Sequence, residues 1–501
     1  MVTLDGESLT LEQTSAVARE GGEVELAASA LARMRQSRAV IERLAAGEAA
    51  IYGVNTGFGQ LSEVRIAPGD LEILQRNILR SHACGVGEPL GDDAVRAMML
   101  IRANVLAKGL SGIRAQVAKR LVALLNKRVT PVVPARGSVG ASGDLAPLAH
   151  MALVLIGEGE AMYEGRRLAG AEALAAAGIA PLTLQAKEGI SLVNGTQAML
   201  AVGGLALLDA EDLAEAADAA CALSLDALKG TPRAFDARLH EARPHPGQRA
   251  SAARLRAWLE GSEIRASHEA CRRVQDAYSL RCAPQVHGAA ADALAEVRRI
   301  AAIELNAATD NPLVFGEQTL SGGNFHGQHL ALAFDYGAMA LSTLAGISER
   351  RTDRLVNPAL NEGLPPFLTT HAGLESGLMM LQVTAAALVA ELRVLAAPAA
   401  AGSITTSGNK EDFVSMGMTA ALKFQRAAAW ARLVLAIEFV AAVHALETLR
   451  PLKTGARLES VRAELAALIR PALEDRPRSR EIEAVSAWLR EWRKRKSAWL
   501  F

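Results

Sequence analysis

Aromatic residues and cysteines are scarce in this 501-residue chain, and neither sign of charge is in excess. Aromatics make up only 4% of the residues, which disfavours β-sandwiches, whose strands use Val, Thr and aromatic side chains. The four cysteines form no C-x-x-C pair, so neither a zinc knuckle nor a disulfide framework is indicated. Lys+Arg and Asp+Glu both number 54, and this zero net charge argues against a nucleic-acid-binding protein.

Long uninterrupted apolar runs are also missing. None reaches the roughly 18 residues that a membrane span needs. The first residues, MVTLDGESLTLEQ, lack the basic and apolar regions of a signal peptide. We therefore expect a cytoplasmic protein that contacts neither a membrane nor nucleic acid. Hydrophobic residues nevertheless make up 50% of the chain, which is ample for a large core.

Alanine and leucine dominate, and their helical spacing predicts a mostly α protein. A helix is expected to end at Gly47, and the glycine-rich residues 51–65 are expected to form a loop. Helical periodicity resumes from about residue 70 to 127, with an interruption at GVGEPLGDD. Short strands are expected around 161–168 and 312–320.

The second half of the chain predicts long helices in a bundle. Residues 430–448 carry few charges, which is typical of a helix buried in a bundle or an oligomer interface. The basic segment 487–496 predicts a solvated terminal helix. We therefore expect a glycine-rich catalytic region over 1–190, followed over 191–501 by a long-helix bundle that completes the site.

Residues 136–144 (RGSVGASGD) form a second glycine cluster. It matches neither G-x-x-x-x-G-K-[ST] nor G-x-G-x-x-G, and Asp144 would repel a phosphate. A tight turn that enters a helix at Asp144 is one interpretation. The other is covalent chemistry within the tripeptide Ala141-Ser142-Gly143, which a sharp backbone bend would allow.

In that chemistry the amide nitrogen of Gly143 attacks the carbonyl carbon of Ala141. Loss of water from the ring and from Ser142 then gives 4-methylideneimidazol-5-one (MIO), an electrophile that ordinary side chains do not provide. Glycine suits the third position because it has no Cβ to block closure. Alanine is small enough for the crowded first position, and serine supplies the hydroxyl that leaves.

The segment GSVGASGDLAPLAH resembles the signature of the aromatic amino acid ammonia-lyases, which build MIO from Ala-Ser-Gly. Further motifs of that family follow the same order along nearly the whole chain. They are YGVNTGFG (52–59), RSHACGVGEP (80–89), EGISLVNGTQ (188–197), VQDAYSLRCAPQVHGA (274–289), TDNPLVF (309–315), GGNFHGQ (322–328) and EDFVSMG (411–417).

The resemblance implies roles for residues in these motifs. Tyr52 matches the base that removes the β-proton, and since a free phenol has a pKa of about 10, such a base needs activation by positive charge or helix dipoles. Arg281 matches the residue that grips the substrate carboxylate, and its spacing from Tyr278 places both on one helical face. Gln275 is expected to complete this polar wall. Asn194 matches the residue that holds the ring and substrate by hydrogen bonds.

Fewer residues bear on substrate choice. Ser81-His82 and Glu411 resemble the residues of the corresponding motifs in the histidine-directed members. A carboxylate facing an imidazole can hold the ring and shuttle a proton. Phe325 is expected to pack near the substrate ring. Lys410 and Phe413 depart from the Gln-Glu-Asp-His pattern usual in those members, as do Ala-Glu-Leu-Arg at 390–393 and the end of GGNFHGQHLA.

The resemblance implies a lyase that removes ammonia from an aromatic L-amino acid, with histidine the expected substrate and urocanate the product. It also implies a homotetramer whose active sites draw residues from several subunits. No metal or nucleotide cofactor is expected, although His326 and His329 are three residues apart. The alternatives are a tyrosine or phenylalanine ammonia-lyase, an MIO-dependent 2,3-aminomutase, and a non-catalytic helical assembly protein that kept the fold.

Overall fold

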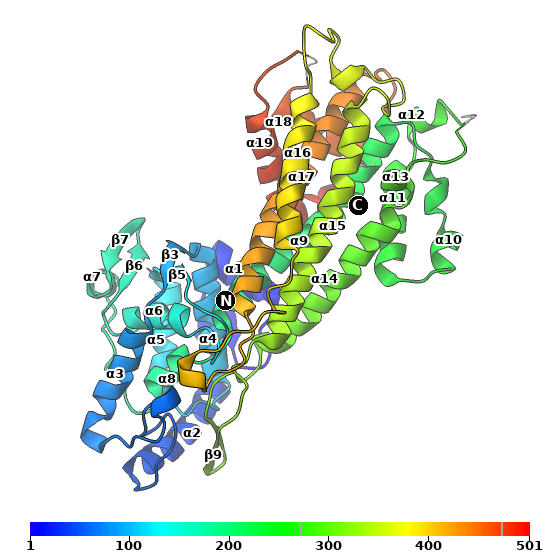
Figure 1. The fold of residues 1–501 in the computed structure, drawn as a ribbon. Coiled ribbons are helices and arrows are strands. Elements are labelled where there is room, and N and C mark those ends of the chain that lie inside the picture. The colour runs from blue at the N-terminus through cyan, green and yellow to red at the C-terminus, as the bar shows by residue number, and fades with distance from the viewer. Residues whose placement is uncertain (270–272, 472–473, 501) are drawn as a thin grey trace. The chain divides into compact units, whose positions relative to one another are not determined.

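The computed structural model describes residues 1–269, 273–471 and 474–500 and is mostly helical (Figure 1). The chain divides into two compact units, each built from three stretches of sequence. The first unit comprises Met1–Leu205, Arg298–Asp335 and Pro398–Leu422, and the second comprises Ala206–Val297, Tyr336–Ala397 and Lys423–Phe501. Each unit therefore combines segments that are far apart along the chain. The functional division into 1–190 and 191–501 stays a prediction.

The first unit combines short helices with small sheets. Its helices are α1 (Leu11–Glu20), α2 (Ala28–Ala46), α3 (Leu71–His82), α4 (Asp92–Ala107), α5 (Ala115–Asn126), α6 (Leu145–Leu155), α7 (Gly170–Ala176) and α8 (Glu188–Val193). Its strands are β1 (Val2–Leu4), β2 (Val24–Leu26), β3 (Val86–Pro89), β4 (Thr130–Pro131), β5 (Pro134–Arg136), β6 (Glu160–Tyr163), β7 (Arg166–Ala169), β8 (Leu313–Phe315) and β9 (Gln318–Leu320). β1 and β2 pair in parallel; β3–β5, β4–β6–β7 and β8–β9 are antiparallel.

Local sequence accounts for several boundaries in the first unit. Thr10 and Gln13 form a capping box at the start of α1, and Gly21 ends that helix with a φ of 75°. Helix α2 ends before Gly47, as the sequence predicts. Strand pairs β6–β7 and β8–β9 confirm the two expected strand regions. The predicted loop after α2 is also confirmed, with only one short 3₁₀ turn, Gly59–Leu61.

Helix α4 forms the core of the first unit. From Ala94 to Ala107 every side chain is buried, including those of Arg102 and Asn104. A helix that is apolar on all sides must be surrounded by other elements, and α1, α2 and α5 pack against it.

Long helices dominate the second unit (Figure 1). Four of the long helices contain residues of both units. They are α9 (Gln197–Ala227), α14 (Ala283–Leu305), α15 (Gln328–Val356) and α17 (Gly417–Glu447). The second unit also contains α10 (Ala237–Glu241), α11 (Pro246–Leu259), α12 (Glu263–Ala266), α13 (Tyr278–Arg281), α16 (Met379–Leu395), α18 (Ala456–Ile469), α19 (Ser479–Arg490), α20 (Trp492–Arg495) and α21 (Ser497–Leu500).

Helices α15 and α17 are long and apolar enough to cross a membrane by length and composition alone. The most apolar window of α17 is 83% buried within the protein and that of α15 is 61% buried, which marks both as core helices. From Val434 to Leu446 no side chain of α17 is more than 2% exposed. The buried helix predicted over 430–448 is confirmed.

The basic C-terminal segment has an aromatic face that the sequence interpretation did not anticipate. Trp488 and Trp492 are buried and pack against Phe439, Trp258 and Trp499, with ring centroids 5.2–6.5 Å apart across the cluster. The segment is divided between α19 and α20. Arg490, Arg493 and Lys494 are exposed, so the expectation of a solvated helix holds for the charged face alone.

Trp492→Ala should lower the free energy of unfolding by about 3–5 kcal/mol, because it empties the centre of this aromatic cluster. Trp430 is the matched control, since it is half-buried and its ring nitrogen donates to Glu391. Trp430→Ala should cost less than half as much. Chemical denaturation followed by far-ultraviolet circular dichroism measures both. Equal losses of unfolding free energy in the two variants would show that the cluster does not contribute more than a half-buried tryptophan.

Candidate active site

The glycine cluster is a sharply bent loop between β5 and α6. Ser142 has a φ of 43° and Gly143 a φ of 81°, so two successive residues lie in the left-handed region, which a serine seldom adopts. The Gly195 backbone nitrogen donates to the Ser142 carbonyl (3.2 Å), and the Asp144 nitrogen donates to the Gly195 carbonyl (2.7 Å). A Cβ on Gly143 would lie 2.1 Å from that Gly195 carbonyl oxygen. Only glycine fits there.

Asp144 lies immediately before α6, so the loop also enters a helix where the alternative interpretation placed it. The Asp144 side chain is fully buried and accepts hydrogen bonds from Ser138 Oγ (2.7 Å) and from the backbone nitrogen of Met199 (2.8 Å). Burial raises the pKa of Asp144 to about 6. The turn and the covalent chemistry are thus compatible, and Asp144 fixes the end of the bend.

The hydroxyl of Ser142 points to Glu411. Ser142 Oγ donates to Glu411 Oε1 at 3.0 Å, and Thr406 Oγ1 donates to the other carboxylate oxygen at 2.8 Å. Residues 406 and 411 also pair through their backbones, which holds the carboxylate in place. The structure therefore brings together residues from the predicted signature and from the predicted EDFVSMG motif, 269 positions apart.

Tyr52 belongs to the same unit, and its electrostatic surroundings differ from the expectation. Burial raises the pKa of Tyr52, the backbone N–H of Gly59 opposes this, and the negative charges of Glu411 and Asp310 raise it further. Its ring meets that of Phe58 edge-on, with centroids 6.3 Å apart. The charges that act on Tyr52 within the described part of this chain are carboxylates, so the activation by positive charge or helix dipoles stays a prediction.

Asn194 ends α8 and has an unused acceptor. Its side-chain Nδ2 donates to the backbone carbonyl of Asn311 (3.1 Å), and its own backbone carbonyl accepts from Arg102 Nη1 (2.8 Å). Its Oδ1 is buried with no hydrogen-bond partner in the described part of the chain. Because a buried acceptor without a partner costs free energy, this atom is a candidate for contact with a ligand.

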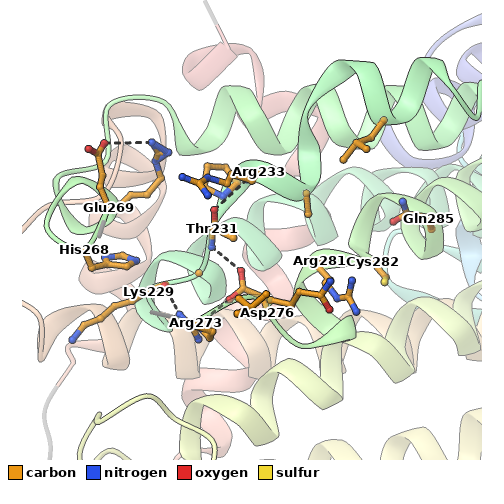
Figure 2. Close-up of a pocket in the computed structure, with 17 residues that line it drawn as sticks. Lys229, Thr231, Arg233, His268, Glu269, Arg273, Asp276, Arg281, Cys282 and Gln285 are labelled. Atoms are coloured by element: carbon orange, nitrogen blue, oxygen red, sulfur yellow. Dashed lines mark hydrogen bonds and ion pairs between the residues drawn. The ribbon is translucent and has the colours of Figure 1, made fainter. Parts of the chain in front are cut away.

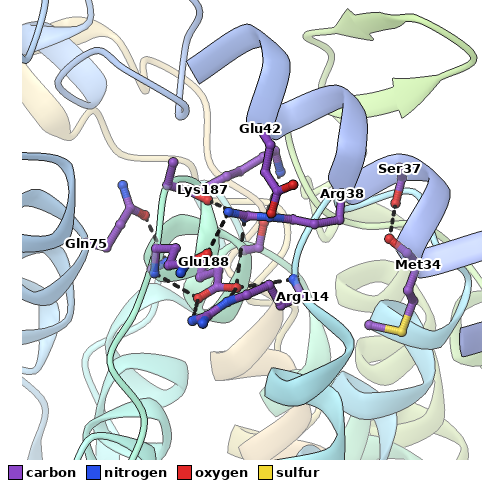
Figure 3. Close-up of polar contacts among 12 residues, drawn as sticks. Met34, Ser37, Arg38, Glu42, Gln75, Arg114, Lys187 and Glu188 are labelled. Carbon is purple, nitrogen blue, oxygen red and sulfur yellow. Dashed lines mark hydrogen bonds and ion pairs between the residues drawn. The ribbon is translucent and has the colours of Figure 1, made fainter. Parts of the chain in front are cut away.

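A set of polar contacts holds α8 in place (Figure 3). The buried carboxylate of Glu188 accepts from Arg114 Nε (2.7 Å) and Nη2 (2.6 Å). Gln75 Oε1 accepts from the backbone nitrogen of Gly189 (2.9 Å), one of the free N–H groups at the start of the helix. The first turn of this short helix is thus fixed, and Asn194 directly follows its last residue.

His82 is the last residue of α3, the helix that also carries Gln75. Its Nδ1 lies 3.0 Å from Ser81 Oγ. Burial lowers the pKa of His82, and a hydrogen bond with the Ile78 backbone and the charge of Glu411 only partly offset this, which favours the neutral imidazole near pH 7. Gln75 therefore connects the helix of His82 with the helix of Asn194.

The remaining motif residues of the first unit are more exposed. Phe325 is half-buried in the turn before α15. The ring of His326 stacks on Phe413, with centroids 6.2 Å apart and planes 18° apart. Phe413 is 60% exposed and Lys410 is exposed. The two departures from the histidine-directed pattern therefore lie at the surface of this unit, beside the half-buried Glu411.

The residues expected to bind the carboxylate belong to the second unit. The Arg281 guanidinium lies 4.6 Å from the centre of the Tyr278 ring, which confirms that both share one face of α13. Arg281 and Gln275 line a cavity of about 750 Å³ rich in cationic side chains, among them Arg233 and Arg265 (Figure 2). Arg281 Nε is buried without a partner in the described residues.

Sequence reasoning missed the buried ion pair of Lys187 and Asp310, whose charged atoms are 3.0 Å apart. Both side chains are fully buried, and Ser191 bonds to both. Burial lowers the pKa of Lys187, while Asp310 opposes the shift. The sequence did contain a signal for this ion pair: a lysine and an aspartate each lie beside apolar motif residues, and a charge buried among apolar residues needs a partner of opposite sign.

Gly143→Ala should prevent the loop from reaching its bent form and lower the melting temperature, because the new Cβ meets the Gly195 carbonyl oxygen. Gly165, in the β6–β7 turn, is the matched control: its φ is 74° and a Cβ there meets nothing within 4 Å. Gly165→Ala carries only the conformational cost of about 1 kcal/mol. Differential scanning calorimetry compares the two variants. Similar melting temperatures would contradict the clash.

Comparisons with known proteins identify the family of this chain. A family model described as aromatic amino acid lyase matches residues 9–467. A histidine ammonia-lyase of Koribacter versatilis (strain Ellin345) is 57% identical over 97% of either chain. The crystal structure of histidine ammonia-lyase from Trypanosoma cruzi is 41% identical and covers 99% of this chain and 94% of that one, with a TM-score of 0.92. The tyrosine aminomutase of Streptomyces globisporus is 38% identical and covers 99% and 98%, with a TM-score of 0.94. The chain belongs to the aromatic amino acid lyase family.

Proposed function

We propose that this chain removes ammonia from L-histidine to give urocanate, the reaction of a histidine ammonia-lyase. The observation that carries the proposal is the left-handed bend at Ser142 and Gly143, with the Ser142 hydroxyl 3.0 Å from Glu411. Relatives that are 51–57% identical over nearly the whole chain are named histidine ammonia-lyases, which supports the choice of substrate.

The family uses the MIO group, and residues 141–143 of this chain fit its formation. Their backbone is already bent, Ala141 is small and buried, and Gly143 lies where no Cβ has room. When formed, the group supplies an electrophile that takes up the substrate amine and makes it a better leaving group.

The residues of this chain then share the remaining tasks. Arg281 binds the substrate carboxylate through its planar guanidinium, with Tyr278 and Gln275 beside it. The free Oδ1 of Asn194 accepts a hydrogen bond from the substrate amine. Tyr52 removes the β-proton. Because its charged neighbours in this chain are carboxylates, the positive charge or helix dipole that favours the phenolate comes from the bound substrate or from another subunit.

Two residues favour histidine over other aromatic substrates. The neutral imidazole of His82 and the carboxylate of Glu411 offer hydrogen bonds to an imidazole ring, and a phenyl ring would leave these polar groups unpaired. Phe325 packs against the ring. A 2,3-aminomutase, or a lyase acting on tyrosine or phenylalanine, is the second candidate, favoured by the likeness to tyrosine aminomutase and by Lys410 and Phe413 beside Glu411.

We further propose that the chain works in the cytoplasm as a homotetramer whose active sites draw residues from several subunits. The support within the second unit is a set of exposed apolar side chains on α16. They are Met379, Met380, Val383 and Val394, between 37% and 74% exposed. Apolar groups collected on one helix are typical of a surface that another subunit covers.

Incubation of the full chain with L-histidine, L-tyrosine and L-phenylalanine separately, with products identified by mass spectrometry and chromatography, tests the substrate. Urocanate should form at least about 100-fold faster than cinnamate-type products, because the polar groups facing the ring discriminate strongly. Glu411→Gln should narrow this preference. A β-amino acid isomer as the main product would favour the aminomutase instead.

Ser142→Ala should abolish the ultraviolet signal of the ring and reduce turnover by at least about 1000-fold, since no side-chain hydroxyl is left to form the methylidene group. Intact mass supplies the direct comparison: the active chain should lack two water molecules relative to its sequence. Ser460→Ala, at an exposed position on α18, is the control and should behave as the unaltered chain. An active protein of fully hydrated mass would overturn the role of residues 141–143.

A further inference from the structure

The second unit contains a hydrogen-bonded network of buried polar side chains that connects four long helices. It runs from Asp218 of α9 through His287 of α14 and Arg351 of α15 to Glu438 of α17, and no member is more than 1% exposed. Asp218 Oδ1 lies 2.8 Å from His287 Nδ1, and Arg351 Nη1 lies 3.2 Å from His287 Nε2. Arg351 also binds both carboxylate oxygens of Glu438, with Nη2 2.8 Å from Oε2.

The donors and acceptors in this network determine where its protons lie. Arginine has no acceptor, so His287 Nε2 must accept from Arg351, and His287 Nδ1 must donate to Asp218. The histidine is therefore neutral. Burial lowers the pKa of His287, and the Asp218 carboxylate only partly offsets this. The half-buried Arg254, whose Nε lies 2.7 Å from Asp218 Oδ2, pairs with that carboxylate, so the charges of the two arginines and the two carboxylates sum to zero.

Glu438 is satisfied without any help from Nη1 of Arg351. Ser224 Oγ donates to its Oε1 at 2.7 Å, and Ser348 Oγ donates to its Oε2 at 2.6 Å. Nε and Nη2 of Arg351 complete the set of donors. Nη1 of Arg351 carries two N–H groups, one for His287 and one for a contact outside this set.

That branch reaches the segment that carries Arg281. Arg351 Nη1 donates to the Ser279 carbonyl oxygen at 3.3 Å. Ser279 lies inside α13, a helix of only four residues, which has too few internal hydrogen bonds to hold its own orientation. The next residue, Leu280, is 1% exposed, whereas Tyr278 is 70% exposed. On its inner side the Ser279 carbonyl and the buried Leu280 hold the turn, while Tyr278 is exposed and Arg281 is half-buried.

We propose that Arg351 is a positioning residue for substrate binding: it holds α13 through the Ser279 carbonyl so that Arg281 meets the substrate carboxylate. The inference rests on the proposed function, in which Arg281 binds that carboxylate. His287 and Glu438 set the position of the Arg351 guanidinium, and Arg351 itself does not touch the substrate.

Arg351→Lys is the first test, because lysine keeps the charge beside Glu438 but lacks the planar second branch. KM for L-histidine should rise about tenfold while kcat changes less than about threefold, since the lost contact orients the carboxylate-binding group. Two competitive inhibitors separate binding of the carboxylate from binding of the rest of the substrate. Inhibition by 3-(imidazol-4-yl)propionate, which has the carboxylate, should weaken about tenfold. Inhibition by histamine, which lacks it, should stay unchanged.

Ser348→Ala is the matched control. It removes another donor to Glu438 from the same helix but leaves the Ser279 contact in place, so both inhibition constants should stay as in the unaltered chain. If Arg351→Lys fails to fold, the double variant Arg351→Met/Glu438→Gln removes both charges together, which buried pairs usually tolerate. The glutamine can still bond to Ser224 and Ser348.

The two inhibition constants decide the proposal. Selective weakening of the carboxylate-bearing inhibitor supports it. Equal weakening of both inhibitors, or unchanged inhibition in a folded Arg351 variant, overturns it. An unaltered chain that binds neither inhibitor and does not turn over L-histidine instead contradicts the proposed function, so the two failures are distinguishable.

Discussion

The left-handed bend at Ser142 and Gly143 is the constraint on which the site depends. Its backbone is held against Gly195 by two hydrogen bonds, and the contact leaves no room for a side chain at position 143. Gly195 directly follows Asn194, so the residue that supports the bend is covalently attached to one that is assigned to the substrate. The same contact therefore sets both the shape of the loop and its distance from Asn194.

Each unit places a fully buried arginine behind a segment of the proposed site. In the first unit Arg102 donates to the Asn194 carbonyl (2.8 Å), and in the second Arg351 donates to the Ser279 carbonyl (3.3 Å). Burying a guanidinium is costly unless charge and hydrogen bonds compensate it. Arg351 has Glu438 as its partner. Arg102 has only the more distant charge of Asp310, and burial lowers its pKa to about 10. The chain bears these costs where a backbone carbonyl next to the site has to be fixed.

Local features could be predicted from the sequence because local chemistry determines them. Gly47 ends α2, glycines open the loop after it, and the three-residue spacing of Tyr278 and Arg281 places both on one face. The Ala-Ser-Gly tripeptide predicted a sharp bend at residues 141–143, because the chemistry expected of those residue types requires one.

Features that depend on contacts between distant segments could not be predicted in this way. Periodicity does not reveal that 298–335 and 398–422 pack with the N-terminal stretch. For the same reason the carboxylates that raise the pKa of Tyr52, rather than cations that would lower it, were missed. The aromatic face of the C-terminal segment was also missed, because its partners Trp258 and Phe439 lie far away in sequence.

The distribution of tryptophan has a spectroscopic consequence. All five tryptophans of the chain belong to the second unit, and four of them, Trp258, Trp488, Trp492 and Trp499, share one cluster. Intrinsic emission excited at the red edge of the indole band therefore reports on the bundle alone. The unit that holds Ser142 contains no tryptophan, so its opening does not contribute to this emission.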